Sequence, residues 1–189
     1  MTKGSKGPSY DAIWATAMKT LQLREQIIAD VVERTGIDEF MIERLVHGFY
    51  AKVRKDRVLG PIFDRHVGNW DHHLKGMCAF WSSVVLMSGR YHGRPMEKHL
   101  PLPIDSRHID RWLGLFEETA LELCPSAAAT HFVERAGRIA QSLELGIAGK
   151  NGILLMRGQR LRRPDAEVYL EGGEGKETDH VKPNIRRHS

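Results

Sequence analysis

Apolar residues recur at three- and four-residue steps through most of this chain, and this spacing restricts the fold more than any other feature. It runs from Tyr10 to about Val32 and again from Met41 to Val53. A third run begins at Asn69, a fourth covers residues 109–123 and a fifth covers residues 132–143. Apolar residues so spaced lie on one face of a helix, and no stretch shows a convincing strand pattern. The sequence therefore predicts an all-α protein.

Glycine and proline separate these runs. Thr35–Gly36 ends the first helix, and Asp38 is suited to cap the second. Leu59-Gly60-Pro61 predicts a corner, with Ile62–Phe63 in a short turn after it, because proline disfavours the helical conformation in the residue before it. The third run is expected to end near Ser88–Gly89. Pro125 ends the fourth.

The interval from residue 89 to residue 105 holds two glycines and three prolines. Only Pro95–Leu100 is left there as a short helix, with Pro95 suited to its first turn. His99 lies at the end of this predicted helix.

A chain of 189 residues is long enough for one domain with a sizeable core. We expect a flexible arm over residues 1–9, one domain over 10–148 that begins with an extra helix, and a tail over 149–189. From Arg157 onward eight Lys or Arg nearly offset six Asp or Glu, and Glu171 to Lys176 is rich in glycine. This composition favours disorder over a second domain.

Charge and cysteine content narrow the class of protein. With 28 Lys and Arg against 24 Asp and Glu, the surface is nearly balanced, which argues against a nucleic-acid partner. No apolar stretch approaches the roughly 20 residues that span a bilayer, so we expect no membrane partner. Cys78 and Cys124 are poor material for a disulfide framework, and no signal peptide is evident, so the expected location is cytoplasmic.

Ten histidines suggest a metal, but the spacings typical of zinc sites are absent, as are the motifs of acyl transfer, phosphate cradling and dinucleotide binding. Periodicity and composition alone would indicate a helical bundle, and a cofactor-free interaction module stays open on that ground.

Five short segments of the sequence say more about the function than periodicity and composition do. The segments at residues 47–54, 59–63, 80–81, 91–100 and 111–116 read HGFYAKVR, LGPIF, FW, YHGRPMEKHL and RWLGLF. In order and spacing they resemble the group III truncated haemoglobins, over about residues 25–147. The resemblance implies a truncated globin fold, a helical sandwich around haem b (iron protoporphyrin IX). The long first helix and the forty residues after Gly149 have no counterpart in it, which leaves the oligomeric state open.

The resemblance assigns His99 as the proximal ligand of the haem iron, and a neutral imidazole is the usual axial ligand in globins. The alternative is a surface histidine at a helix C-terminus. Tyr50, His73 and Trp112 are assigned to the distal pocket, where all three can donate a hydrogen bond to a bound ligand. Met77 is their apolar neighbour. Each donor also has an ordinary alternative, as a core aromatic or a surface histidine.

The same resemblance implies a set of residues that line or back the haem, although aromatic residues at helical spacing are often plain core. Three basic residues near His99 are suited to the haem propionates, with surface solvation as the alternative for at least one of them. The lining set is Phe49, Phe63, Phe80, Trp81 and Leu100, and the basic residues are Arg90, Arg94 and Lys98.

The implied function is binding of oxygen, nitric oxide or a similar small ligand. Several distal donors would retain a ligand tightly, which favours redox work or removal of nitric oxide and reactive species over oxygen transport. Whether the chain is an enzyme, such as a nitric oxide dioxygenase or a peroxidase, is left open. Turnover would need a separate reductase, because the chain has no flavin or nicotinamide motif. The alternative is a haem- or gas-responsive protein that signals through its tail.

Overall fold

The computed structural model describes residues 9–170, which form helices joined by short loops and hold no β-strand. This confirms the all-α prediction. The elements are α1 (Tyr10–Thr35), α2 (Glu39–Val53), α3 (Gly60–His66), α4 (Trp70–Val85), α5 (Pro95–His99), α6 (Ser106–Leu123), α7 (Ser126–Lys150), the 3-10 turn η1 (Pro164–Ala166) and α8 (Glu167–Leu170).

Side-chain caps fix where two of the helices begin. Asp38 Oδ1 accepts a hydrogen bond from the Met41 backbone N–H at 2.7 Å, as the sequence predicts. Asn69 Oδ1 accepts from the His72 N–H at 2.9 Å and starts α4. Each cap satisfies a backbone donor that the first turn of a helix leaves unpaired.

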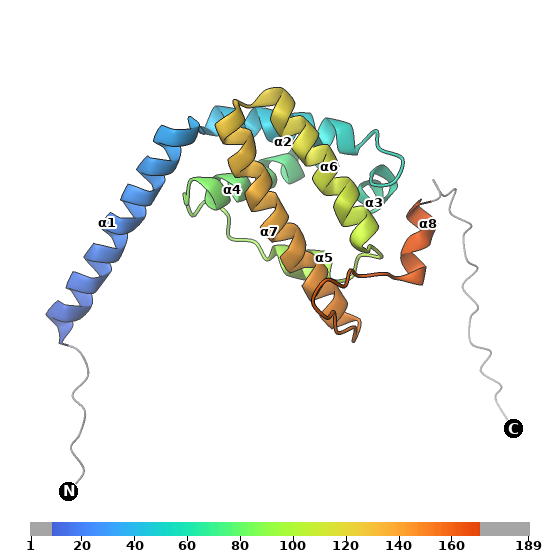
Figure 1. Cartoon of the computed structure of the whole chain (residues 1–189). Coiled ribbons are helices and arrows are strands. Elements are labelled where there is room, and N and C mark those ends of the chain that lie inside the picture. Colours follow the sequence, from blue (N-terminus) through green and yellow to red (C-terminus); the bar gives the residue numbers. More distant parts are fainter. Residues whose placement is uncertain (1–8, 171–189) are drawn as a thin grey trace, which may run out of the picture.

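The helices α2, α4, α6 and α7 surround a core of stacked aromatic rings (Figure 1). Trp81 stacks on Phe116, with ring centroids 4.7 Å apart. Phe49 meets Phe116 edge-on at 5.2 Å, and Phe132 meets Trp81 edge-on at 5.9 Å. All four side chains are fully buried. These rings hold the four helices together and form the back of the candidate functional site.

A glycine lets α2 lie close to α6. A Cβ atom on Gly48 would lie 2.6 Å from Leu123 Cδ1, which is closer than real side chains approach. The close crossing places Phe49 of α2 against the aromatic face of α6, where it contacts Trp112 and Phe116.

The corner after α2 differs from the sequence expectation. Residues 60–66 form α3, so the prediction that Ile62–Phe63 lie in a turn was wrong. Pro61 lies in the first helical turn, where a missing N–H costs nothing. The chain instead bends just before α3, where Asp56 Oδ1 accepts hydrogen bonds from the N–H groups of Val58 and Leu59.

The end of α4 also differs. The helix stops at Val85, before the Ser88–Gly89 stop that the sequence predicts. Met87 has a φ of 48°, in the left-handed region, and this conformation turns the chain away from the helix axis before Gly89 is reached.

Helix α1 extends away from the rest of the domain (Figure 1). Only its C-terminal part is packed, with Val31 buried and Ile28 half-buried. No helix within residues 9–170 is both long enough and apolar enough to cross a membrane.

Residues 151–163, here called the C-terminal strap, run back along the domain after α7. The sequence expectation excluded this segment from the fold, whereas the structure buries Leu161 fully in a cluster with Ile62, Ile104 and Ile147. The packed chain continues through η1 and α8 to residue 170. Residues 1–8 of the expected arm over 1–9, and the rest of the expected tail, 171–189, lie outside the described residues.

A buried acid fastens the strap to α7. The Glu144 carboxylate accepts hydrogen bonds from Arg160 Nε, at 2.9 and 3.0 Å, and from the Leu161 N–H at 2.7 Å. Arg160 also reaches Asp110 on α6 at 2.6 Å. This contact could not be predicted from the sequence, because the partners are far apart along the chain and the strap has no helical period.

Candidate functional site

The short helix α5 holds His99 in a defined state. Pro95 occupies its first turn, as predicted, and the Pro95 carbonyl oxygen lies 2.7 Å from His99 Nδ1. Because a carbonyl oxygen only accepts, Nδ1 carries the hydrogen, and Nε2 of the neutral ring keeps its lone pair. Burial lowers the pKa of His99, and the positive charge of Lys98 lowers it further. His99 is therefore a neutral, half-buried imidazole with one nitrogen available to bind a metal.

A glycine on α7 lets the side chains of α5 pack close to the backbone of that helix. A Cβ atom on Gly146 would lie 2.4 Å from Met96 Sδ and 3.7 Å from Leu100 Cδ2. The side chains of α5 thus rest on a bare stretch of α7, an arrangement that sequence reasoning did not find. The pair of small residues, Gly146 and Ala148, beside a buried Ile147 was the only available signal.

Tyr50 on α2 and His73 on α4 are brought together. Their ring centroids lie 4.9 Å apart at an interplanar angle of 89°. Burial raises the pKa of Tyr50, and the nearby Cys78 raises it further, so the hydroxyl keeps its proton and can donate.

The imidazole of His73 has an unusual environment. Its Nε2 is buried and has no hydrogen-bond partner within residues 9–170. Burial lowers the pKa of His73, and the positive charge of Lys98 lowers it further. An unpartnered buried nitrogen costs about 1–3 kcal/mol, which makes it a candidate ligand contact.

Trp112 on α6 joins this group through Phe49. The Phe49 ring lies 5.0 Å from Tyr50 and 5.5 Å from Trp112, edge-on to both. Trp112 also stacks on Phe116 at 5.4 Å and stays half-buried. The three distal residues expected from sequence therefore form one aromatic cluster with Phe49 at its centre. Met77, which is half-buried, packs against the main core.

The expected lining residues divide into two kinds. Phe49 and Trp81 are fully buried, so they back the region. Phe63, Phe80 and Leu100 are half-buried and keep surface that a ligand can contact. Phe63 meets Tyr50 at 5.7 Å and His73 at 6.2 Å.

Basic side chains around α5 are exposed. Arg94 pairs with Glu97 at 3.0 Å, and its side chain is 79% exposed. Lys98 is exposed and lies directly before His99. Both can reach anionic groups at the surface, and the Arg94–Glu97 pair would have to open for Arg94 to do so.

Trp70 is a neighbour that sequence reasoning missed. Its ring lies 5.7 Å from His73 and 6.1 Å from Tyr50, and the Arg54 guanidinium carbon lies 4.8 Å from its ring centroid. Trp70 precedes His73 by three residues on α4, so helical spacing alone could have placed it on the same face.

A separate open hollow of about 540 Å³ lies between α6, α7 and the strap. Ile109, Leu113 and Met156 are among the residues that line it, and none of the expected site residues does.

Comparison with known proteins defines the class of this chain. Residues 30–142 match the family described as bacterial-like globin. The chain therefore belongs to the bacterial-like globin family, whose members are haem-binding proteins that take small gaseous ligands such as oxygen. The truncated globin fold expected from the sequence is confirmed.

Comparison with individual proteins shows which groups of truncated haemoglobins this chain is similar to. Group 3 truncated hemoglobin ctb of Campylobacter jejuni is 35% identical over 113 residues, which cover 57% of this chain and 89% of that protein. Group 2 truncated hemoglobin YjbI of Bacillus subtilis is 28% identical over 85 residues, covering 44% and 64%. The crystal structure of group III truncated hemoglobin from Campylobacter jejuni matches with a TM-score of 0.56 and 33% identity, over 65% of this chain and 96% of that one. The predicted resemblance to group III truncated haemoglobins is confirmed.

Proposed function

We propose that this chain binds haem b through His99 Nε2 and uses Tyr50, His73 and Trp112 to hold a small ligand on the opposite side. The observation that carries the proposal is the hydrogen bond between His99 Nδ1 and the Pro95 carbonyl. It fixes the tautomer and the ring orientation that an axial ligand needs, as second-shell partners of metal-binding histidines generally do. The resident group fits these residues because one imidazole nitrogen is available and the surrounding rings are apolar.

The distal assignment rests on the donors and their burial. The raised pKa of Tyr50 keeps its hydroxyl protonated, and the lowered pKa of His73 keeps its ring neutral, with the unpartnered Nε2 aimed at no protein group. The Tyr50 hydroxyl and the His73 ring can each donate a hydrogen bond to a polar ligand, and their burial keeps bulk water away from that ligand. A hydrogen bond to a charged acceptor contributes about 1.5–3 kcal/mol, so two or three donors slow ligand escape by orders of magnitude.

Phe63, Phe80, Met77 and Leu100 would supply apolar contact to the haem, and the buried Phe49 and Trp81 would support these side chains from behind. Lys98 and Arg94 are the groups proposed for the two propionates. Lys98 is the better placed of the two, because Arg94 already pairs with Glu97.

Bound haem supplies reversible binding of small diatomic gases and one-electron chemistry. Tight retention is a poor property for delivery, so the proposed role is redox work or removal of nitric oxide and reactive species, with electrons from a separate reductase. The proposed location is the cytoplasm, since both cysteines of the chain, Cys78 and Cys124, are free thiols.

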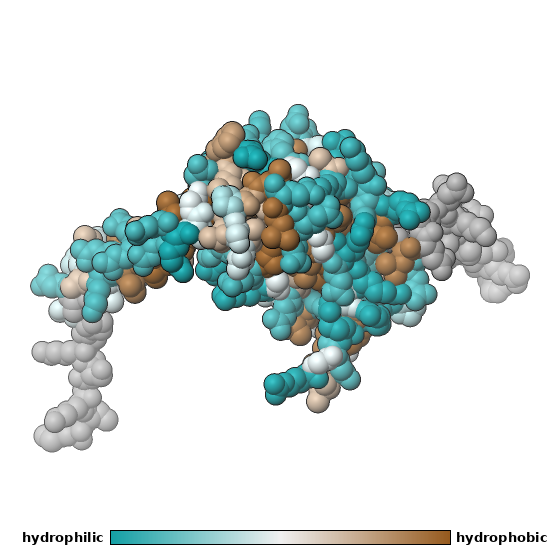
Figure 2. All heavy atoms as spheres, turned by 45° about the horizontal axis from the view of Figure 1, so that its top comes forward, coloured by the Kyte–Doolittle hydropathy of each residue, from teal (hydrophilic) through white to brown (hydrophobic). Residues whose placement is uncertain are grey.

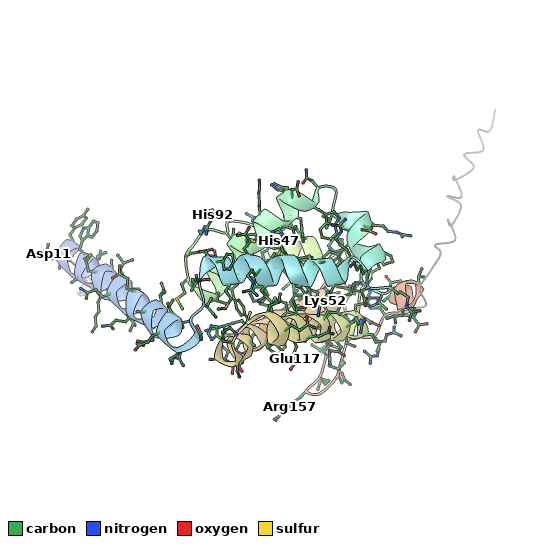
Figure 3. The ribbon with its side chains drawn as sticks, turned by 90° about the horizontal axis from the view of Figure 1, so that it is seen from above. Asp11, His47, Lys52, His92, Glu117 and Arg157 are labelled. Carbon is green, nitrogen blue, oxygen red and sulfur yellow. The ribbon has the colours of Figure 1, made fainter. Side chains whose placement is uncertain are left out.

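Haemin titration of full-length His99→Ala tests the proposal, with His92→Ala as the matched control. His92 is an exposed residue in the loop between α4 and α5 and is labelled in Figure 3. We expect the affinity for haemin to fall by at least tenfold in the first variant and to stay unchanged in the second. Equal affinity in both variants, with an unaltered ferrous absorption spectrum, would refute the assignment of His99.

A further inference from the structure

We propose that the C-terminal strap holds α5 in place, and that Leu161 and Arg160 are positioning residues for His99. The inference rests on the proposed role of His99. Helix α5 has five residues and none of them is buried, so it cannot be fixed by a core of its own. A ligand histidine on such a helix needs support from the segments around it.

The strap grips the chain immediately after α5. The Arg163 guanidinium donates to the Leu102 carbonyl at 3.0 Å, and the Leu161 carbonyl accepts from the Ser106 N–H at 3.1 Å. Leu102 and Ile104 also pack in the apolar cluster that contains Leu161. The loop from α5 to α6 is therefore held at both its backbone and its side chains.

The same cluster reaches the opposite side of the site. Ile62 of α3 packs in it, and the next residue, Phe63, contacts Tyr50 and His73. Leu161 thus links the segment that follows His99 to the segment beside the distal residues. The match to the globin family covers residues 30–142, so the strap lies outside the matched region.

Arg160 anchors the strap more firmly than an exposed ion pair would. The Glu144 side chain is only 8% exposed and accepts from both Arg160 Nε and the Leu161 N–H. Removing one partner of such a pair leaves a buried charge without compensation. Changes at Arg160 or Leu161 should therefore loosen α5 without touching any residue of the site.

Hydrogen–deuterium exchange of the haem-free full-length chain tests this directly. We expect Leu161→Ala to speed exchange over residues 95–105 by at least tenfold, with α6 and the first half of α7 unchanged. Leu154→Ala, in the same strap but 84% exposed, is the control and should match the wild type. Arg160→Gln is a milder second variant that should act in the same direction.

Haem transfer to an excess of an apo-globin acceptor is the second readout. Leu161→Ala should release haem at least tenfold faster than Leu154→Ala. Unchanged exchange over residues 95–105, or equal acceleration throughout α6 and α7, would overturn the proposal. Failure of the His99 assignment would be seen separately, as an unchanged haemin affinity of His99→Ala beside a selective change in exchange.

Helix α1 supports an independent inference, because its apolar stripe has no cover in the described chain. The stripe comprises side chains at helical spacing on one face, each between 53% and 75% exposed: Tyr10, Ile13, Trp14, Met18 and Leu21. Figure 2 shows brown, hydrophobic spheres beside the teal ones along α1. Helices of this kind gain most of their stability by packing an apolar face, so a partner is required.

We infer that a second copy of this chain covers the stripe through its own α1. The eight residues before the described chain, MTKGSKGP, include one large apolar side chain, and α8 lies at the far end of the molecule (Figure 1). The charged residues of α1 have both signs, Asp11, Lys19 and Glu25 among them, unlike the basic face of membrane-surface helices. Two facing stripes would bury on the order of 1,000 Å², the lower limit for a specific interface.

Sedimentation equilibrium of the full chain tests the pairing. We expect a reversible dimer that dissociates at low-micromolar concentration, a monomer for Leu21→Glu, and a dimer for the control Gln26→Glu on the opposite face of α1. A monomeric wild-type chain at about 100 μM would refute the inference. So would a dimer that survives Leu21→Glu, or binding of the chain to phosphatidylglycerol vesicles through α1.

Discussion

His73→Leu should stabilise the haem-free protein while impairing ligand retention. The His73 Nε2 is buried and unpartnered, and such a group costs about 1–3 kcal/mol. Leucine has a similar volume and no polar atom, so the substitution removes that cost. It also removes edge-on contacts with Tyr50, Phe63 and Trp70, which contribute about 0.5–1.5 kcal/mol for a ring pair. An imidazole is smaller than the rings for which that range holds, so we take the lower end, and the three contacts together cost about 1.5 kcal/mol. Against a mid-range gain of about 2 kcal/mol, the expected net gain in the free energy of unfolding is about 0.5 kcal/mol.

Urea unfolding of the haem-free chain measures this difference, with His72→Leu as the control. His72 is the exposed neighbour of His73 on α4, so its replacement should change the unfolding free energy by less than about 0.5 kcal/mol. The reasoning fails if His73→Leu lowers the unfolding free energy by 1 kcal/mol or more. A gain in stability with faster oxygen release from the haem-loaded protein would show that His73 is retained for ligand binding.

Three further outcomes follow from the same structure. Tyr50→Phe and Trp112→Phe should each speed oxygen release by about 10- to 100-fold in stopped-flow measurements, because each removes one donor; unchanged release rates would exclude a distal role. Gly48→Phe should lower the melting temperature, because its Cβ alone would lie 2.6 Å from Leu123 Cδ1 and 3.4 Å from Thr119 Cγ2, so a large side chain would crowd α6, and overpacking costs about 1–3 kcal/mol; an unchanged melting temperature would contradict the close crossing of α2 and α6. Four histidines have lower pKa values in the folded chain than in the unfolded chain, so just below pH 6.5 it is mainly the unfolded chain that gains protons. The unfolding free energy of the haem-free chain should therefore fall as the pH drops below about 6.5, and it should be nearly independent of these histidines above about pH 7.5. An unfolding free energy that rises on acidification from pH 7 to pH 5.5 would contradict this expectation. The histidines with lowered pKa values are His73, His99, His108 and His131.

The parts of the fold that sequence predicts are those with a local cause. The Asp38 cap and the step-of-four apolar positions of α2 act within one or two turns, so they can be read directly. Pro95 and His99 bracket α5 for the same reason, whereas the hydrogen bond from His99 Nδ1 to the Pro95 carbonyl was not predicted.

The features that could not be predicted from the sequence depend on contacts between residues that are far apart in the chain. A seven-residue helix such as α3 is too short for its period to be recognised, and its two apolar residues suit a turn equally well. Leu161 is an isolated apolar residue among charges, and its burial depends on Ile62 and Ile104, far away in the chain. The contact between Gly146 and Met96 likewise exists only after α5 and α7 meet.

The bond between His99 and the haem iron is the claim on which the proposed function depends. Resonance Raman spectroscopy of the ferrous haem-loaded protein measures the iron–histidine stretching band directly. We expect this band in the wild type, its absence in His99→Gly, and its return when imidazole is added to that variant. An unchanged band in His99→Gly without imidazole would show that another residue holds the iron.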